Sequence, residues 1–227
     1  MELIPPIKFI QISDTHRLIP SRYPSAGILD EITTPEELKI ICDLETWTND
    51  RTNAQFGVLN LIPDDEWVLG IPNATIIMAA FCHPSPTGGR FNTSTLGAWY
   101  AAFDLETAVK ETSYHRYKEF TEVGRKDGYT CMRQYLADFD TEFHDIRDDL
   151  STYRTLHNSD DYKESQKFSE FLKKIGSNGI LYNSVHSDGH HCLVSFRPKL
   201  VKNVRQGSHF NYFWDIEGNF KFEEIKT

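Results

Sequence analysis

The pattern of apolar and polar positions predicts short strands along the whole chain. The first covers Phe9–Leu18, where apolar residues recur among polar ones. A turn-rich strand region is predicted over Leu59–Pro72, and a hairpin turn around residues 217–219. Further strands are predicted where apolar or aromatic runs are bounded by loops, over Gly97–Phe103, Thr130–Ala137, Gly179–Tyr182, Cys192–Phe196 and Phe210–Trp214.

Helix signals occur in three segments between these strands. Thr34 followed by Pro and two acids predicts a helix through Leu44. Leu105–Phe120 carries apolar residues on one face and follows Asp104, a good N-cap residue. A third helix is predicted from Ser159 to Gly176, a typical C-terminal glycine. Ala74–Phe81 is a buried strand or a helix, because periodicity does not distinguish the two.

Composition and charge narrow the class of protein. The chain has 227 residues, 39% of them hydrophobic, and this favours one globular domain. A net charge of −9 argues against direct nucleic-acid binding, although a few arginines in a cleft still bind a small anion. The chain has no apolar run long enough to span a membrane and does not begin with a signal-peptide pattern. We therefore expect a cytoplasmic protein with no membrane association.

The four cysteines support the same compartment. They are widely scattered and form no C-x-x-C pair; they are Cys42, Cys82, Cys131 and Cys192. We interpret them as reduced thiols, which are usual in the cytoplasm.

Candidate chemistry is concentrated between residues 88 and 115. Two glycines precede Arg90, so a backbone can approach a ligand there while the guanidinium binds a phosphate. Tyr100 lies among alanines that leave room for a flat ring. Glu111 lies on the helix that follows. Taken singly, each residue is better explained as a turn arginine, a core aromatic or a solvated helix charge.

Taken together, these residues resemble the RES-domain family, which is named for an arginine, a glutamate and a serine. The family pattern has a Gly-Gly-Arg-Trp-Asn-like turn, a Tyr-x-Ala strand and a helix with a glutamate. Here Tyr100 lies 10 residues after Arg90, and Glu111 lies 11 residues after Tyr100. The segment Gly179-Ile-Leu-Tyr-Asn-Ser places the serine at Ser184, and the first strand places a further arginine at Arg17. The resemblance covers nearly the whole chain in order.

The resemblance implies a single α+β domain over residues 1–227. Its fold is expected to be similar to that of ADP-ribosyltransferases, with a split, mostly antiparallel sheet flanked by helices. A family-variable helical segment is expected at about residues 25–85, where the role of Arg22 stays open. The chain departs from the family pattern at Phe91, Asn183 and His186, where tryptophan, proline and arginine are common.

The resemblance also implies an activity, which is cleavage of the nicotinamide–ribose bond of NAD⁺ by the toxin of a toxin–antitoxin pair. NAD⁺ is then the substrate, and no other cofactor or metal is needed. Glu111 would stabilise the positive charge that develops on the ribose. Tyr100 would pack beside nicotinamide, and Arg17 and Arg90 would bind the pyrophosphate. Ser184 would bind ribose or the nicotinamide amide, or fix Glu111.

Several alternatives remain open. The acceptor of ADP-ribose is water, phosphate or a protein side chain; the last would make the chain a mono-ADP-ribosyltransferase. A non-catalytic NAD⁺-binding module is a third possibility. Asp188, His190, His191 and Cys192 suggest a metal site only weakly, because few side chains of a contiguous run converge on one point. A cysteine–histidine nucleophile pair lacks a supporting motif. A cognate antitoxin that covers the active site is the expected partner.

Overall fold

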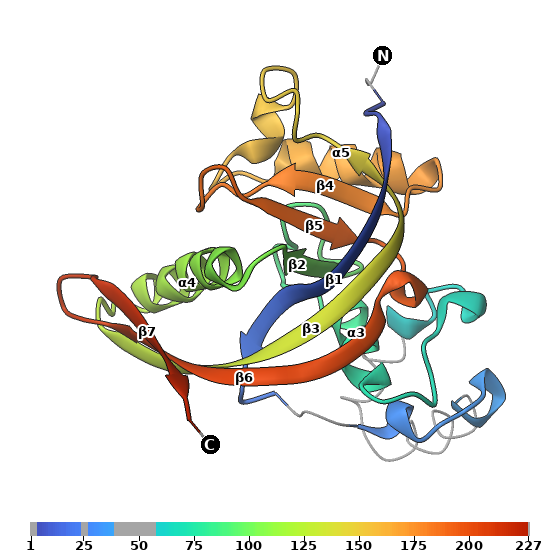
Figure 1. The fold of residues 1–227 in the computed structure, drawn as a ribbon, viewed down its shortest axis with the longest axis horizontal. Coiled ribbons are helices and arrows are strands. Elements are labelled where there is room, and N and C mark those ends of the chain that lie inside the picture. Colours follow the sequence, from blue (N-terminus) through green and yellow to red (C-terminus); the bar gives the residue numbers. More distant parts are fainter. Residues whose placement is uncertain (1–3, 24–26, 39–57, 227) are drawn as a thin grey trace.

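The computed structural model describes residues 4–23, 27–38 and 58–226 (Figure 1). Its strands are β1 Ile7–Pro20, β2 Trp99–Ala102, β3 Gly128–Asp145, β4 Gly179–Asn183, β5 His191–Ser195, β6 Lys202–Trp214 and β7 Phe220–Ile225. The α-helices with defined bounds are α3 Ala74–Cys82, α4 Leu105–Glu122 and α5 Lys163–Lys174. Short 3-10 turns are η1 Ile28–Asp30, η2 Asp64–Glu66, η3 Arg154–His157 and η4 Pro198–Leu200.

The seven strands form one sheet in the order β1-β2-β5-β4-β3-β6-β7. One arm contains the long strands β1, β3 and β6, which lie side by side in Figure 1 as a curved layer, together with β7. The other arm contains the short strands β2, β5 and β4. The arms meet where β1 pairs with β2 at His16 and where β3 runs parallel to β4; the remaining pairings are antiparallel. The expected α+β fold with a split, mostly antiparallel sheet is confirmed.

Two hydrophobic clusters fill the two faces of this sheet. Side chains that are neighbours along β5 alternate between them, because successive strand residues point to opposite faces: Leu193 belongs to one cluster and Val194 to the other. The first cluster includes α3, and the second includes residues of α4 and α5. Tyr100 on β2 packs against the second cluster. The sheet therefore presents Tyr100 on the same side as α4, the helix that carries Glu111.

Most predicted elements are confirmed, and several strands are longer than predicted. The strand predicted over Phe9–Leu18 extends to Pro20, and the one predicted over Thr130–Ala137 is the central part of β3. The ambiguous segment Ala74–Phe81 is helical. Helix α4 begins after Asp104, whose carboxylate accepts a hydrogen bond from the backbone N–H of Thr107 at 2.8 Å.

One prediction is wrong, and one lies partly outside the described residues. No strand occupies residues 59–72, which lie wholly in the described part; turns and η2 are found there. Pro63 has no N–H for a ladder and Gly70 has a φ of 66°, while Trp67 and Val68 are buried in the core and Trp67 Nε1 donates a hydrogen bond to the Ile62 carbonyl at 2.9 Å. The helix predicted from Thr34 is present at residues 35–38, and its predicted continuation lies outside the described residues.

Candidate active site

The Gly-Gly-Arg-Phe-Asn segment forms a tight turn that is fastened by Tyr100. The Tyr100 hydroxyl donates a hydrogen bond to Oδ1 of Asn92 and accepts one from the backbone N–H of Phe91, both at 2.8 Å. A Cβ on Gly89 would lie 2.6 Å from Asn92 Oδ1 and 2.8 Å from the Tyr100 hydroxyl. Glycine is therefore required at residue 89 by this close approach. Burial raises the pKa of Tyr100, so its hydroxyl stays protonated at neutral pH.

Arg90 points from this turn toward the segment before α5. It is buried, and its Nη1 donates hydrogen bonds to the backbone carbonyls of Leu156 at 3.1 Å and Asn158 at 2.5 Å. Its guanidinium also lies 4.9 Å from the centre of the Tyr162 ring. Nη1 of Arg90 thus links the Gly-Gly-Arg turn to the segment before α5. The other guanidinium nitrogens make no hydrogen bond within the described residues.

Arg17 reaches the same region from β1. Its Nη1 donates a hydrogen bond to the backbone carbonyl of Tyr100 at 3.2 Å, and its guanidinium lies 4.9 Å from the Trp99 ring centre. Burial lowers its pKa to about 10, which still leaves it charged at neutral pH. Arg17, Tyr100 and Arg90 therefore form one connected group, which we call the turn half of the site.

Glu111 and Ser184 form the second group. The Ser184 hydroxyl donates to Glu111 Oε1 at 2.5 Å, and the backbone N–H of Val185 donates to the same oxygen at 3.2 Å. The other oxygen, Oε2, lies 4.0 Å from Nε2 of His186. The Glu111 side chain keeps 18% of its surface exposed. Serine and backbone donors thus fix one carboxylate oxygen and leave the second available; we call this group the carboxylate half.

Electrostatics connects the two halves. Burial raises the pKa of Tyr162, the charge of Arg90 opposes this rise, and the charge of Glu111 adds to it. Burial lowers the pKa of His186, and this ring responds to the same two charges in the same sense as Tyr162, since Glu111 raises its pKa and Arg90 lowers it. A cation and a carboxylate that both act on the same two rings lie in one region. The structure therefore brings Arg90, Tyr100, Glu111 and Ser184 together. Arg17 contacts this group through the backbone carbonyl of Tyr100, while its guanidinium lies over Trp99, a residue of the first cluster.

Sequence reasoning missed several residues of this region. Trp99 supports Arg17, Tyr162 supports Arg90, and Asn92 holds the Tyr100 hydroxyl. Asn92 was visible as the last residue of the turn motif, whereas nothing in the sequence distinguishes Tyr162 from other tyrosines. Arg22, whose role the sequence left open, is exposed and contacts Tyr23 instead of this group.

The residues considered for a metal site or a cysteine nucleophile have other surroundings in the structure. The His190 ring pairs with Asp104, and the His191 ring pairs with Asn183 Oδ1, each at 2.9 Å. Within the described residues, no group of three or more His, Cys, Asp or Glu side chains is arranged to hold a metal ion. Burial raises the pKa of Cys82 to about 12, which makes it a poor nucleophile.

The cysteines of the described part are free thiols, namely Cys82, Cys131 and Cys192. Cys42 lies outside the described residues. No described helix is both long enough and apolar enough to cross a membrane.

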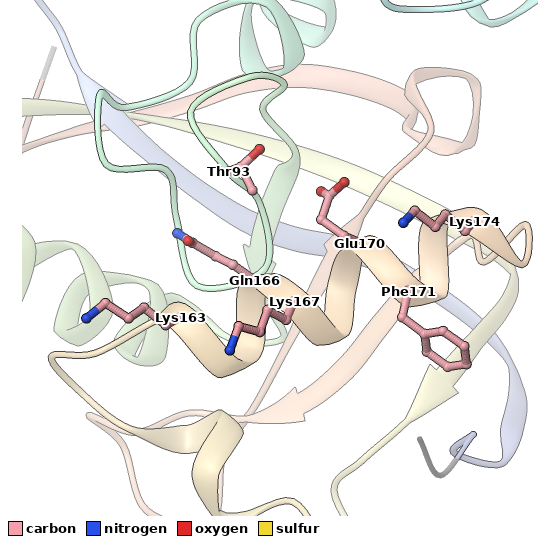
Figure 2. Close-up of a pocket in the computed structure, with 7 residues that line it drawn as sticks. All are labelled: Thr93, Lys163, Gln166, Lys167, Glu170, Phe171 and Lys174. Carbon is pink, nitrogen blue, oxygen red and sulfur yellow. The ribbon is translucent and has the colours of Figure 1, made fainter. Parts of the chain in front are cut away.

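A surface pocket lies along α5 (Figure 2). It is lined by Thr93, Lys163, Gln166, Lys167, Glu170, Phe171 and Lys174. Gln166 connects this pocket to the turn, because its Nε2 donates to the backbone carbonyls of Thr87 and Gly89, both at 3.0 Å. None of the five predicted site residues lines this pocket. The pocket thus adjoins the Gly-Gly-Arg turn without belonging to the candidate active site.

Two known proteins share a likeness with this chain. The chain is 22% identical over 207 residues to the uncharacterized protein y4oC of Sinorhizobium fredii, an alignment covering 88% of this chain and 82% of y4oC. The crystal structure of the M. tuberculosis MbcT–MbcA toxin–antitoxin complex contains a chain that is 12% identical. That match has a TM-score of 0.45 and covers 88% of this chain and 85% of the other.

A family match covers more than half of the chain. Residues 66–215 match the RES domain. This range contains Arg90, Tyr100, Glu111 and Ser184, whereas Arg17 precedes it. The chain belongs to the RES-domain family.

Proposed function

We propose that this protein cleaves the nicotinamide–ribose bond of NAD⁺ and acts as the toxin of a toxin–antitoxin pair. The observation that carries the proposal is the Glu111 carboxylate, which Ser184 and the Val185 N–H hold by one oxygen while the other is uncommitted. Cationic side chains lie nearby for an anionic substrate. The proposal includes a cytoplasmic location and a single domain over residues 1–227.

The chemistry follows from these groups. When the bond between ribose C1′ and the nicotinamide nitrogen breaks, its electron pair leaves with neutral nicotinamide, and positive charge develops on the ribose. The uncommitted oxygen of Glu111 stabilises that charge. Ser184 and Val185 keep the carboxylate oriented, so little reorganisation is needed during the reaction. An acceptor, water or phosphate, then adds to C1′ and loses a proton.

The arginines bind and orient the substrate in this proposal. Arg90 uses Nη1 for the carbonyls of Leu156 and Asn158, and its remaining N–H groups are directed to the pyrophosphate. Arg17 adds a second positive charge from the other side of Tyr100. The Tyr100 ring packs beside nicotinamide, because its hydroxyl is already committed to the turn. Ser184 acts mainly by fixing Glu111.

The proposed partner is a small antitoxin protein that covers this site and excludes NAD⁺. Family membership supports this proposal, and the solved complex with which the chain shares a weak likeness contains a toxin and its antitoxin. Growth arrest and loss of cellular NAD⁺ on expression of this chain alone are the expected results. Expression without either effect contradicts the toxin role.

The test of the activity is nicotinamide release from NAD⁺ by the purified chain, followed by chromatography. Glu111→Gln is expected to slow release by about 10²–10⁴-fold, the usual contribution of a charge-stabilising group. Glu106→Gln is the matched control: Glu106 lies on the same helix, is exposed and pairs only with Lys110. Absence of turnover by the wild-type chain, or equal turnover by Glu111→Gln, contradicts the proposal.

The products identify the acceptor. Free ADP-ribose indicates water, and a phosphorylated ADP-ribose formed only when phosphate is added indicates phosphate. Label from NAD⁺ that becomes covalently attached to a protein would instead indicate a mono-ADP-ribosyltransferase. Binding of NAD⁺ without nicotinamide release would indicate a non-catalytic module.

A further inference from the structure

His186 lies in the loop between β4 and β5 and is held in a fixed position by α4. Its ring stacks on Tyr114 with centroids 4.0 Å apart and planes 25° from parallel, and its edge meets His115 at 6.3 Å. Its backbone N–H donates to the Ser184 hydroxyl at 3.2 Å. Tyr114 and His115 follow Glu111 by three and four residues, so they lie one helical turn from it on the same face. The helix that carries the carboxylate thus also positions the imidazole.

The imidazole faces the uncommitted oxygen of Glu111. Nε2 of His186 lies 4.0 Å from Glu111 Oε2, which is beyond hydrogen-bond distance but within reach of a small side-chain movement. This nitrogen is buried and makes no hydrogen bond with any described residue. Both hydrogen bonds that Glu111 accepts go to Oε1. An unpaired nitrogen and an unpaired carboxylate oxygen therefore face each other inside the site.

We propose that His186 is a positioning residue whose charge state decides whether Glu111 Oε2 is available to the ribose. A neutral imidazole leaves the oxygen free. A protonated imidazole pairs with it, neutralises its charge and withdraws it from the substrate. The inference rests on the proposed NAD⁺ cleavage and adds acid inactivation to it.

The surroundings of the imidazole set which state prevails. The groups that face it are Glu111, Tyr114 and His115 on α4, Arg90 on the turn, and Asp160 before α5. Asp160 is partly committed, because it accepts a hydrogen bond from the Tyr114 hydroxyl at 2.6 Å.

Two opposing influences act on the His186 proton. Burial is the largest and lowers the pKa of His186; Arg90 acts in the same direction, while Glu111 and Asp160 oppose it. His186 is accordingly neutral at pH 7, the state that leaves Glu111 available.

The first experiment measures nicotinamide release between pH 4.5 and 8. Wild-type activity is expected to fall as the pH is lowered through the pKa of His186. In His186→Gln this loss is absent, so the variant keeps at least about tenfold more of its pH 7.5 rate at the acid end than wild type does. His186→Lys places a permanent charge beside Glu111 and is expected to lower kcat at every pH with little change in KM. His186→Gln with the same acid loss as wild type overturns the proposal.

His115→Gln is the matched control, because it removes the neighbouring ring. Burial lowers the pKa of His115 to about 4, so this residue stays neutral over most of the range. The variant is expected to keep the acid loss of wild type. The proposal is overturned if His115→Gln abolishes the acid loss while His186→Gln retains it, because the effect would then belong to His115.

The second experiment does not depend on activity. NMR titration of the His186 imidazole is compared in wild type and Glu111→Gln. Since the charge of Glu111 favours the protonated ring, its removal is expected to lower the pKa of His186. An unchanged pKa overturns the inference even where NAD⁺ is cleaved. A lowered pKa in a protein that does not cleave NAD⁺ leaves the His186–Glu111 pairing intact and refutes only the proposed function.

Discussion

The two halves of the candidate site differ in how their polar groups are satisfied. In the turn half, the Tyr100 hydroxyl both donates and accepts, and Arg90 Nη1 binds two carbonyls. In the carboxylate half, Glu111 Oε2 and His186 Nε2 make no hydrogen bond with described residues. The turn half is therefore a scaffold whose disruption costs stability. The carboxylate half keeps unpaired groups for chemistry, so changes there should affect rate more than folding.

Among the tests of this comparison between the two halves, the largest expected effect is on the rate, from Ser184→Ala. Glu111 then keeps only the Val185 N–H, and a carboxylate that is displaced by about 1 Å costs roughly 10²-fold in NAD⁺ cleavage. The free energy of unfolding should change by about 1 kcal/mol, the value of one hydrogen bond. Steady-state kinetics and urea unfolding measure both quantities. Ser113→Ala on α4, whose hydroxyl bonds only the Lys110 carbonyl, is the control.

The second effect is on stability, from Arg90→Met. The carbonyls of Leu156 and Asn158 each lose a charged donor in a buried setting, which should lower the free energy of unfolding by about 3 kcal/mol. Urea unfolding is the measurement. Arg125→Met is the control, because Arg125 is exposed and forms only a long surface ion pair with Asp127, at 3.6 Å. Equal stability of the two variants would contradict the view that the turn half serves as a scaffold.

The third effect concerns the pH dependence of stability and comes from His115 on α4, which lies beside His186. The folded-state pKa of His115 is about 4, below its unfolded value, so the unfolded chain binds more protons between these values. Stability is therefore lost as the pH falls below about 6.5, and His115 contributes roughly 2 kcal/mol of that loss by pH 5. The loss between pH 7 and pH 5 should be smaller by this amount in His115→Gln. An equal loss in both proteins would contradict the prediction.

The smallest effect is expected for Tyr100→Phe. The ring remains, but the Phe91 N–H loses its acceptor and Asn92 Oδ1 loses its donor, so the free energy of unfolding should fall by about 1 kcal/mol. Tyr129→Phe removes an exposed hydroxyl that bonds Asn211 and should change stability by less than about 0.5 kcal/mol. Thermal unfolding of both variants makes the comparison. A larger loss in Tyr129→Phe would show that the turn is not fixed by Tyr100.

The sequence predicted those features that depend on local signals. The alternation around Phe9, the cap at Asp104 and the motif at Arg90 each reside in a few adjacent residues. The sequence did not predict the partners of Arg90, since they are backbone carbonyls and leave no mark in the side chains. It also misassigned residues 59–72, because burial of Trp67 and Val68 in turns produces the same apolar run as a strand.

The position of His186 shows the same limit of local sequence signals. The sequence showed a histidine where arginine is common in the family. Only the packing of its loop against α4 showed that the ring stacks on Tyr114 and faces Glu111. Contacts between segments that are far apart in the chain decide such roles, and local patterns do not report them.

The pairing of β1 with β3 has a consequence for the order of events during synthesis. Residues 7–20 pair with residues 132–144, so the strand that carries Arg17 has only its single pairing with β2 at His16 until β3 has been made. At ordinary translation rates this interval lasts on the order of 5–20 seconds. Ser184 follows later still, and the β4–β5 pairing that positions its loop needs residue 195. We therefore expect that no nascent or truncated chain ending before β5 is active, and that activity arises only when nearly the whole chain has left the ribosome.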